Sequence, residues 1–263
     1  MRAFRVAYDG SPFYGFQRQP DVPTVEDTLF DSLCALGVAD NVPEGYAAAG
    51  RTDAGVSALA QTVAFECPEW LSPSAFNSEL PGEIRVWAST DVDPAFHATH
   101  DAYYREYVYH SHAPRANLGL AKDASRRLSG EHDFHNLTPD TEGTVRDLDI
   151  DVLQDDDYLV FTLRAGGFAR NLVRRVVSLI HAIATGEEEM AKIDRVLASE
   201  PLDGKEGVPC APAHPLYLAD VGYDLEFAVD GAATKSLHDV FGDLRVERRT
   251  RSRVARDICR TIE

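Results

Sequence analysis

The sequence predicts an α+β fold with antiparallel sheets, and three kinds of segment carry that prediction. Several runs alternate apolar and polar residues and end in Gly, Pro or Asp, as β-strands do. Two such runs meet at three consecutive aspartates, which is typical of a β-hairpin. Single amphipathic helices separate the strands. Strands joined by hairpins and by single helices favour antiparallel sheets, and the pattern occurs twice along the chain.

The individual elements follow from local signals. A helix is expected from Val25 to Leu36, because Thr24 is a suitable N-cap, Asp27 follows three residues later and Gly37 ends the apolar stripe. A second helix is expected from Asn171 to Thr185, where an apolar stripe recurs at helical spacing before a glycine. The strands are expected at residues 4–8, 57–66, 83–90 and 104–110, and in the hairpin at 146–165.

A loop-like segment divides the chain into two similar halves, each expected to be an antiparallel sheet flanked by helices. We expect an N-terminal α+β domain over residues 1–100, a C-terminal α+β domain over 101–222, and an arginine-rich extension of unknown role over 223–263. The extension is either a solvated helix that pairs with acidic neighbours or an anion-binding arm. An acidic protein offers many internal partners, which favours the solvated helix.

The composition is strongly acidic. The 263 residues include 43 Asp and Glu against 26 Lys and Arg, a net charge of −17. Taken alone, this charge argues against a polyanionic partner. Molar salt screens such repulsion, however, so the lysine-poor acidic composition favours a halophilic source. No apolar window is long enough to span a membrane, so we expect a cytoplasmic protein.

Several kinds of chemistry lack support in the sequence. The four cysteines form no C-x-x-C pair, so they indicate neither a zinc site nor a disulfide framework. His132 and His135 have the spacing of metal ligands, but no third ligand accompanies them, and we expect no metal. Phosphate-binding, dinucleotide-binding and hydrolase motifs are missing as well.

The stretch GRTDAG places Arg51 and Asp53 between glycines at the start of a strand. An Asp beside Gly is most often a turn residue. Here the glycines permit close approach by a substrate, and the strand would fix the position of the side chain. A carboxylate beside a cation stays ionised, so Asp53 suits a nucleophile or an electrostatic stabiliser better than a proton donor.

Arginines crowd the start of the second helix, behind two glycines. Arg170 and Arg175 either bind phosphate there or form surface ion pairs. Arg174 is embedded in the apolar pattern, so it needs a carboxylate partner, and Asp53 is the candidate. Tyrosines crowd the strand that follows residue 102, where an aromatic strand face is the simplest interpretation. A tyrosine on a polar-lined face can also stack on a planar base.

Three stretches together resemble the tRNA pseudouridine synthase A family. They are FRVAYDGSPFYGFQRQ, GRTDAGVSALAQTVAFE and FARNLVRRVV, and FHATHDAYYREYVY lies between the last two. The similarity covers roughly residues 4 to 220. The resemblance implies the pseudouridine synthase fold with a cleft between its halves, a homodimer, no cofactor, and isomerisation of uridine at positions 38 to 40 of the tRNA anticodon stem-loop.

The resemblance also implies roles for individual residues. Asp53 matches the family's nucleophile, Tyr104 its active-site tyrosine and Arg174 its second arginine. Arg51 matches the arginine two residues before the nucleophile, and we take Arg51, Arg170 and Arg175 as the candidate substrate-binding residues. The chain departs from the family at three positions: Ser57 replaces a usual His, Phe16 a common Trp, and Glu106 a common second aromatic.

Three other functions stay open from the sequence. The chain is alternatively a non-catalytic RNA-binding module of the same fold, or a pseudouridine synthase that acts on another RNA. A carboxylate-based hydrolase of glycosidic bonds would need a second acid near Asp53, and the local sequence offers none.

Overall fold

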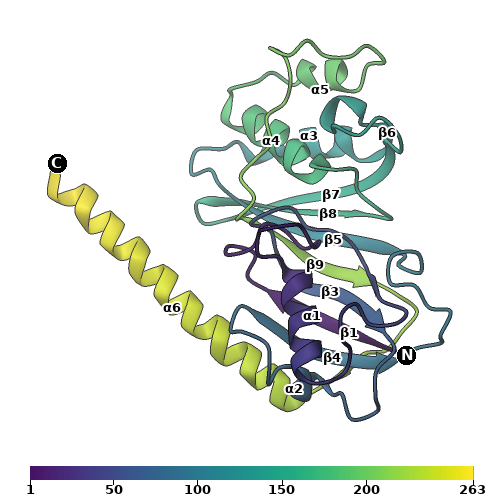
Figure 1. Ribbon diagram of the computed structural model, residues 1–263. Helices are drawn as coiled ribbons and strands as arrows, with labels where there is room; N and C mark the ends of the chain where they lie inside the picture. The colour runs from purple at the N-terminus through teal and green to yellow at the C-terminus, as the bar shows by residue number, and fades with distance from the viewer. Residues whose placement is uncertain (263) are drawn as a thin grey trace.

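One sheet of ten strands runs through the body of the computed structural model, which describes residues 1–262 (Figure 1). The strands are β1 (Arg2–Tyr8), β2 (Ala47–Ala48), β3 (Ser57–Phe65), β4 (Ile84–Asp91), β5 (Tyr104–His112), β6 (Gly130–Asp133), β7 (Val145–Asp155), β8 (Tyr158–Ala165), β9 (Leu216–Gly222) and β10 (Ala228–Val229). Their order in space is β10-β4-β1-β3-β9-β5-β8-β7-β6, with β2 beside β3. The pairings are antiparallel, apart from the parallel pair of β3 and β9.

The helices are α1 (Val25–Ala35), α2 (Pro73–Phe76), α3 (Leu118–Leu128), α4 (Leu172–Thr185), α5 (Ala191–Val196) and α6 (Gly231–Ile262), with a short 3-10 turn at His135–Leu137. Two of the helices, α1 and α4, begin and end close to the predicted residues. Thr24 caps α1 as predicted, because its Oγ1 accepts a hydrogen bond from the Asp27 backbone N–H at 3.2 Å. Gly186 ends α4 in the left-handed conformation, at φ 82°.

Two hydrophobic cores lie on the same face of the sheet. In one core α1 covers β1, β3 and β4 (Figure 1), and Leu29 and Leu33 belong to the same buried cluster as Phe4. In the other, α3 and α4 cover β5, β7 and β8. Tyr107 on β5 packs against both cores. A side chain on a strand points to one face only, so both groups of helices lie on the face to which Tyr107 points.

The α+β prediction is confirmed, and so are the positions of the strands, the hairpin and the two helices. The two halves are not separate sheets, because β9 of the C-terminal half inserts between β3 and β5. The extension is also tied to the first half, since β10 pairs with β4. The division into 1–100, 101–222 and 223–263 therefore stays a prediction. Within residues 1–262, no helix has the length and apolar character to cross a membrane.

Candidate active site

The loop that carries Asp53 is held by the segment that follows β1. This Asp53 loop, residues 49–56, connects β2 to β3. Phe16 donates its backbone N–H to the Thr52 carbonyl oxygen at 3.0 Å. Gly15 adopts φ +106°, and a Cβ at this position would lie 3.0 Å from the same Thr52 oxygen. The two glycine-containing motifs of the sequence are therefore one packed unit, and this packing explains why they occur together.

Arg174 forms an ion pair with Asp53, as the sequence predicted. Arg174 Nη1 lies 3.1 Å from Asp53 Oδ2, and Arg174 Nε donates to the Ala211 carbonyl oxygen at 2.7 Å. The bond to the Ala211 carbonyl oxygen fixes the guanidinium, and the ion pair with the guanidinium fixes Asp53 Oδ2. Asp53 Oδ1 accepts no hydrogen bond from the residues that the structure describes. The carboxylate is thus oriented, with 37% of the Asp53 side chain exposed and one oxygen open to the space beside it.

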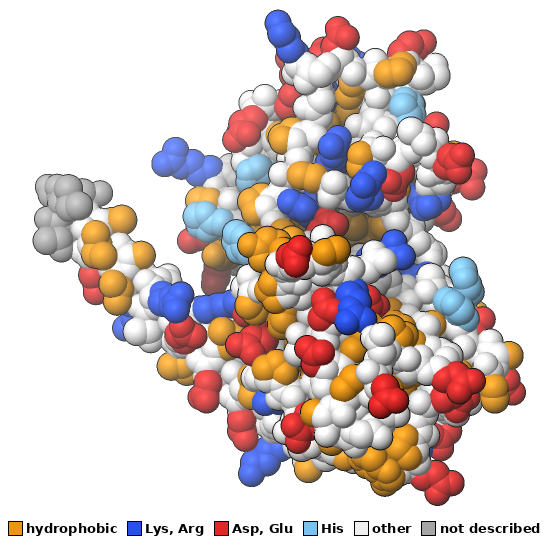
Figure 2. Space-filling view, viewed as in Figure 1, with side chains coloured by type: hydrophobic (Ala, Val, Ile, Leu, Met, Phe, Trp, Pro, Cys, Tyr) orange, Lys and Arg blue, Asp and Glu red, His pale blue; other side chains and the backbone are white. Residues whose placement is uncertain are grey.

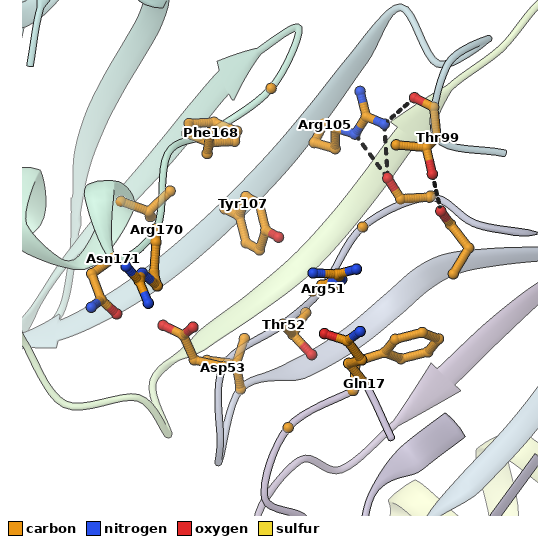
Figure 3. Close-up of a pocket in the computed structure, with 18 of the residues that line it drawn as sticks. Gln17, Arg51, Thr52, Asp53, Thr99, Arg105, Tyr107, Phe168, Arg170 and Asn171 are labelled. Carbon is orange, nitrogen blue, oxygen red and sulfur yellow. Dashed lines mark hydrogen bonds between the residues drawn. The ribbon is translucent and has the colours of Figure 1, made fainter. Parts of the chain in front are cut away.

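That space is a cavity of about 1130 Å³ between the two halves of the protein. In Figure 3, Asp53 and Arg51 rise from one wall, while Tyr107 and Phe168 form the opposite one. Arg170 also lines the cavity. Its size suits a nucleotide with part of its backbone, since ligand pockets commonly span a few hundred to about a thousand Å³.

Tyr107 presents an aromatic ring to the cavity. Its ring meets Phe168 edge to face, with centroids 5.3 Å apart and an interplanar angle of 85°. Burial raises the pKa of the Tyr107 phenol to about 12, and the negative charge of Asp53 adds to the shift. The phenol therefore stays protonated at neutral pH and offers a neutral hydroxyl and a flat ring.

Tyr104, the tyrosine chosen from the sequence, lies outside this cavity. It points to the opposite face of β5, where its hydroxyl donates to Asp220 Oδ2 at 2.7 Å. The guanidinium carbon of Arg164 lies 3.7 Å from the centre of the Tyr104 ring. Tyr107, three residues later on β5, lines the cavity where Tyr104 was expected. The active-site role of either tyrosine stays a prediction.

The candidate substrate-binding arginines differ in their surroundings. Arg51 is exposed, lines the cavity and forms no ion pair with the described residues. Arg170 lines the cavity too, but its Nη2 lies 3.2 Å from Asp140 Oδ1. The Arg170 backbone N–H and then the Arg170 charge lower the pKa of Asp140, which keeps this ion pair intact at neutral pH. Arg175 does not line the cavity formed by the described residues.

Arg105 was not among the site residues chosen from the sequence. Its guanidinium donates to three backbone carbonyl oxygens: Ala49 at 2.8 Å, Thr99 at 2.5 Å and Gly166 at 2.5 Å. Figure 3 shows the bond to Thr99. These oxygens belong to the Asp53 loop, the segment before β5 and the turn after β8. Arg105 shares a strand face with Tyr107, and this alternation was the one available signal. Within residues 1–262, no cluster of three or more His, Cys, Asp or Glu side chains suits a metal ion.

Known proteins match this chain over nearly its whole length. A family profile described as tRNA pseudouridine synthase matches residues 124–224. The tRNA pseudouridine synthase A of Natronomonas pharaonis is 54% identical over 97% of both chains. That of Halobacterium salinarum is 55% identical over 97% of both chains, and that of Methanothrix thermoacetophila 39% identical over 87% of this chain and 85% of its own.

Among solved structures, an archaeal box H/ACA sRNP complex of Nop10 and Cbf5 aligns with 70% of this chain and 43% of that chain, at a TM-score of 0.38 and 14% identity. The matches in sequence are much closer. With the fold and the site, they define a class of protein, the pseudouridine synthases, which are isomerases. Within that class, the chain belongs to the tRNA pseudouridine synthase A family. The first relatives come from halophilic archaea, in keeping with the acidic composition.

Proposed function

We propose that this protein isomerises uridine to pseudouridine in the anticodon stem-loop of tRNA, at positions 38 to 40, with Asp53 as the nucleophile. The observation that carries the proposal is the Asp53–Arg174 ion pair at a cavity large enough for an extruded nucleotide. Family membership supports tRNA as the substrate, and the resemblance of the motifs supports the anticodon stem-loop. The same resemblance supports a homodimer, and the tRNA substrate supports a cytoplasmic location.

The reaction suits an oriented carboxylate. The bond between N1 of the base and C1′ of the sugar breaks, the base turns, and C5 bonds to C1′. C5 then loses a proton and N1 gains one, so atoms and electrons balance without an external reactant. Asp53 Oδ1 is the oxygen free to attack, either at C6 of the base or at C1′ of the sugar, and the bond that it forms breaks again as the product forms, which regenerates the carboxylate. Arg174 keeps the other oxygen in place and stabilises the negative charge.

The other cavity residues suit the binding of an extruded base. Taking a base out of its stack costs a few kcal/mol, which an aromatic platform offsets. Tyr107 supplies the platform, and Phe168 supports its ring edge to face. Arg51, which has no ion-pair partner among the described residues, either contacts the RNA backbone or fills the space that the base leaves.

The decisive experiment incubates the protein with an unmodified tRNA transcript and maps the modified uridines. Asp53→Asn is the matched control, because it keeps the side-chain shape and removes the charge. We expect pseudouridine at positions 38 to 40 with the native protein, and tRNA binding without product for the variant. A non-catalytic RNA-binding module would leave the transcript unmodified with either protein. Modification of another RNA in preference to tRNA would show that the substrate is that RNA. Release of free uracil would indicate a hydrolase.

A further inference from the structure

The outer half of α6 stands apart from the catalytic cavity. Figure 1 shows α6 leaving the sheet beside β4 and projecting away from the body. Its first turns pack against β4 and α2, where Ala233 is buried and Ser236 accepts a hydrogen bond from Arg85 Nε at 3.0 Å. From Arg245 to Arg260 the side chains are exposed, and we call this segment the arginine arm. None of its residues lines the cavity.

The arginine arm has a net positive charge, opposite in sign to the net charge of the whole protein. It carries seven arginines and two acidic residues, in a chain whose net charge is −17. In Figure 2 the projecting helix carries Lys or Arg side chains together with hydrophobic and acidic ones. Arg245, Arg249 and Arg253 recur every fourth residue, so they form one row along the helix. Among the described residues, these three form no hydrogen bond or ion pair.

Arg248 joins the arginine arm to the segment that follows β1. Arg248 Nη2 donates to Asp9 Oδ2 at 2.6 Å and to Ser11 Oγ at 2.9 Å. Only 8% of the Asp9 side chain is exposed. Asp9 begins the segment that packs against the Asp53 loop. The arm is therefore held in a fixed direction relative to the cavity, and the row through Arg249 is turned about 100° away from Arg248 around the helix axis.

We propose that the arginine arm binds the sugar-phosphate backbone of the tRNA at a place remote from the reacting uridine. This inference rests on the proposed function, which supplies tRNA as the partner. Guanidinium groups pair with phosphate through two parallel hydrogen bonds, and a row of unpaired arginines complements a polyanion. The arm also resolves the conflict between an acidic protein and an RNA substrate, since it concentrates positive charge on one exposed segment.

A second copy of the chain is the competing occupant of this helix. Val246, Val254 and Ile258 are more than half exposed on the arm, and such residues can pair two helices. Arm-to-arm pairing would bring together two segments that each carry five net positive charges. Repulsion opposes that arrangement, whereas the phosphates of RNA neutralise the same charge.

The test uses the full-length triple variant R245Q/R249Q/R253Q. Its matched control is R115Q/R126Q/R127Q, which makes the same charge change on exposed residues around α3. Affinity for an unmodified tRNA transcript and for the isolated anticodon stem-loop is measured across a range of KCl concentrations. We expect the arm variant to bind the whole tRNA at least about tenfold more weakly, with a slope of log Kd against log [KCl] reduced by about two to three.

The single-turnover rate at saturating enzyme should be unchanged in the arm variant, and so should affinity for the stem-loop. Unchanged affinity and slope for whole tRNA would overturn the proposal, as would an equal loss on both RNAs. A change in oligomeric state, measured by light scattering, without a change in slope would assign the arm to a second copy. If the native protein binds tRNA but makes no pseudouridine, the proposed function fails while the affinity measurements still decide the role of the arm.

Discussion

Asp53 and Arg174 meet across the two halves of the protein, with Asp53 Oδ2 3.1 Å from Arg174 Nη1 although 121 positions separate them in the sequence. The contact connects the Asp53 loop to the first turn of α4. Arg174 also holds the Ala211 carbonyl oxygen, and the Ala211 backbone N–H bonds back to the Arg174 carbonyl oxygen at 3.3 Å. The carboxylate is thus positioned by a group that is itself fixed on both sides.

Replacing Arg174 with Gln should therefore reduce catalysis more than binding. We expect the single-turnover rate at saturating tRNA to fall about 10²- to 10³-fold, a loss typical for one preorganised charged donor. The tRNA Kd should change little, because Arg174 already has protein partners. Arg174→Lys keeps the charge but cannot reach Asp53 and Ala211 together, so it should recover only part of the rate. A normal rate in the Gln variant would show that the ion pair has no role in the reaction.

Tyr107 and Tyr104 provide a direct comparison between the two faces of β5. We expect Tyr107→Ala to lower the single-turnover rate by about 10- to 100-fold, since an aromatic platform for a base is worth about 1–3 kcal/mol. Tyr107→Phe keeps the ring and should keep most of the rate.

Tyr104→Phe, the control, removes only the hydrogen bond to Asp220 on the other face. It should leave the rate unchanged and lower the free energy of unfolding by about 1 kcal/mol. The reverse pattern, with a slow Tyr104→Phe variant and an active Tyr107→Ala variant, would restore the choice made from the sequence.

The ion pair at the centre of the site was predictable because burial limits the options of a charged side chain. An arginine within an apolar helical stripe needs a carboxylate, and GRTDAG was the one glycine-flanked motif with a fixed position on a strand. The choice between Tyr104 and Tyr107 was not fixed in this way. Strand alternation places the two residues on opposite faces, but it does not say which face carries the helices.

The continuous sheet and the role of Arg105 depend on contacts between distant parts of the chain. The pairing of β9 with β3 joins residues near 217 to residues near 57, and local patterns carry no signal for such a pairing. Arg105 bonds to backbone carbonyl oxygens, whose positions are set only by the folded chain. Side-chain chemistry was therefore predictable where it demands a particular partner, and unpredictable where the partner is the backbone.

Asp230 should control how firmly α6 is attached. Its Oδ1 accepts the backbone N–H of Ala233 at 3.0 Å, and Ser74 Oγ donates to its carboxylate at 2.7 Å. The variant Asp230→Ala loses the cap and the link to α2. We expect a loss of about 1–2 kcal/mol in the free energy of unfolding, measured by denaturant titration. Asp230→Asn, which keeps an acceptor oxygen, should lose less, and equal losses would mean that the cap itself contributes nothing.

The same residue predicts a pH dependence. The Ala233 N–H lowers the pKa of Asp230 first of all, and the Ser74 hydroxyl adds to the effect. A carboxyl with a lowered folded-state pKa stabilises the protein fully above its unfolded pKa of about 3.9, and this contribution is lost as the pH falls through the folded-state value. The native protein should thus lose the Asp230 contribution only below about pH 4. The difference in stability between native protein and Asp230→Ala should be constant from pH 5 to 8 and shrink in acid.

Salt should stabilise the protein, because with a net charge of −17 its carboxylates repel one another in the folded state. At 1 M salt the Debye length is about 3 Å, so repulsion between separate surface carboxylates is screened while contacts such as Asp53–Arg174 remain. We expect the melting temperature to rise by about 10 °C or more between low salt and molar KCl, equivalent to roughly 3–5 kcal/mol.

The exposed turn between β7 and β8 offers a sharper comparison. D155N/D156N/D157N removes three negative charges, and asparagine tolerates the positive φ of Asp156. This variant should melt higher than the native protein at low salt and equally in molar KCl, whereas Arg115→Gln should melt lower at low salt. A native protein most stable at low ionic strength would contradict the explanation of the acidic surface as an adaptation to salt.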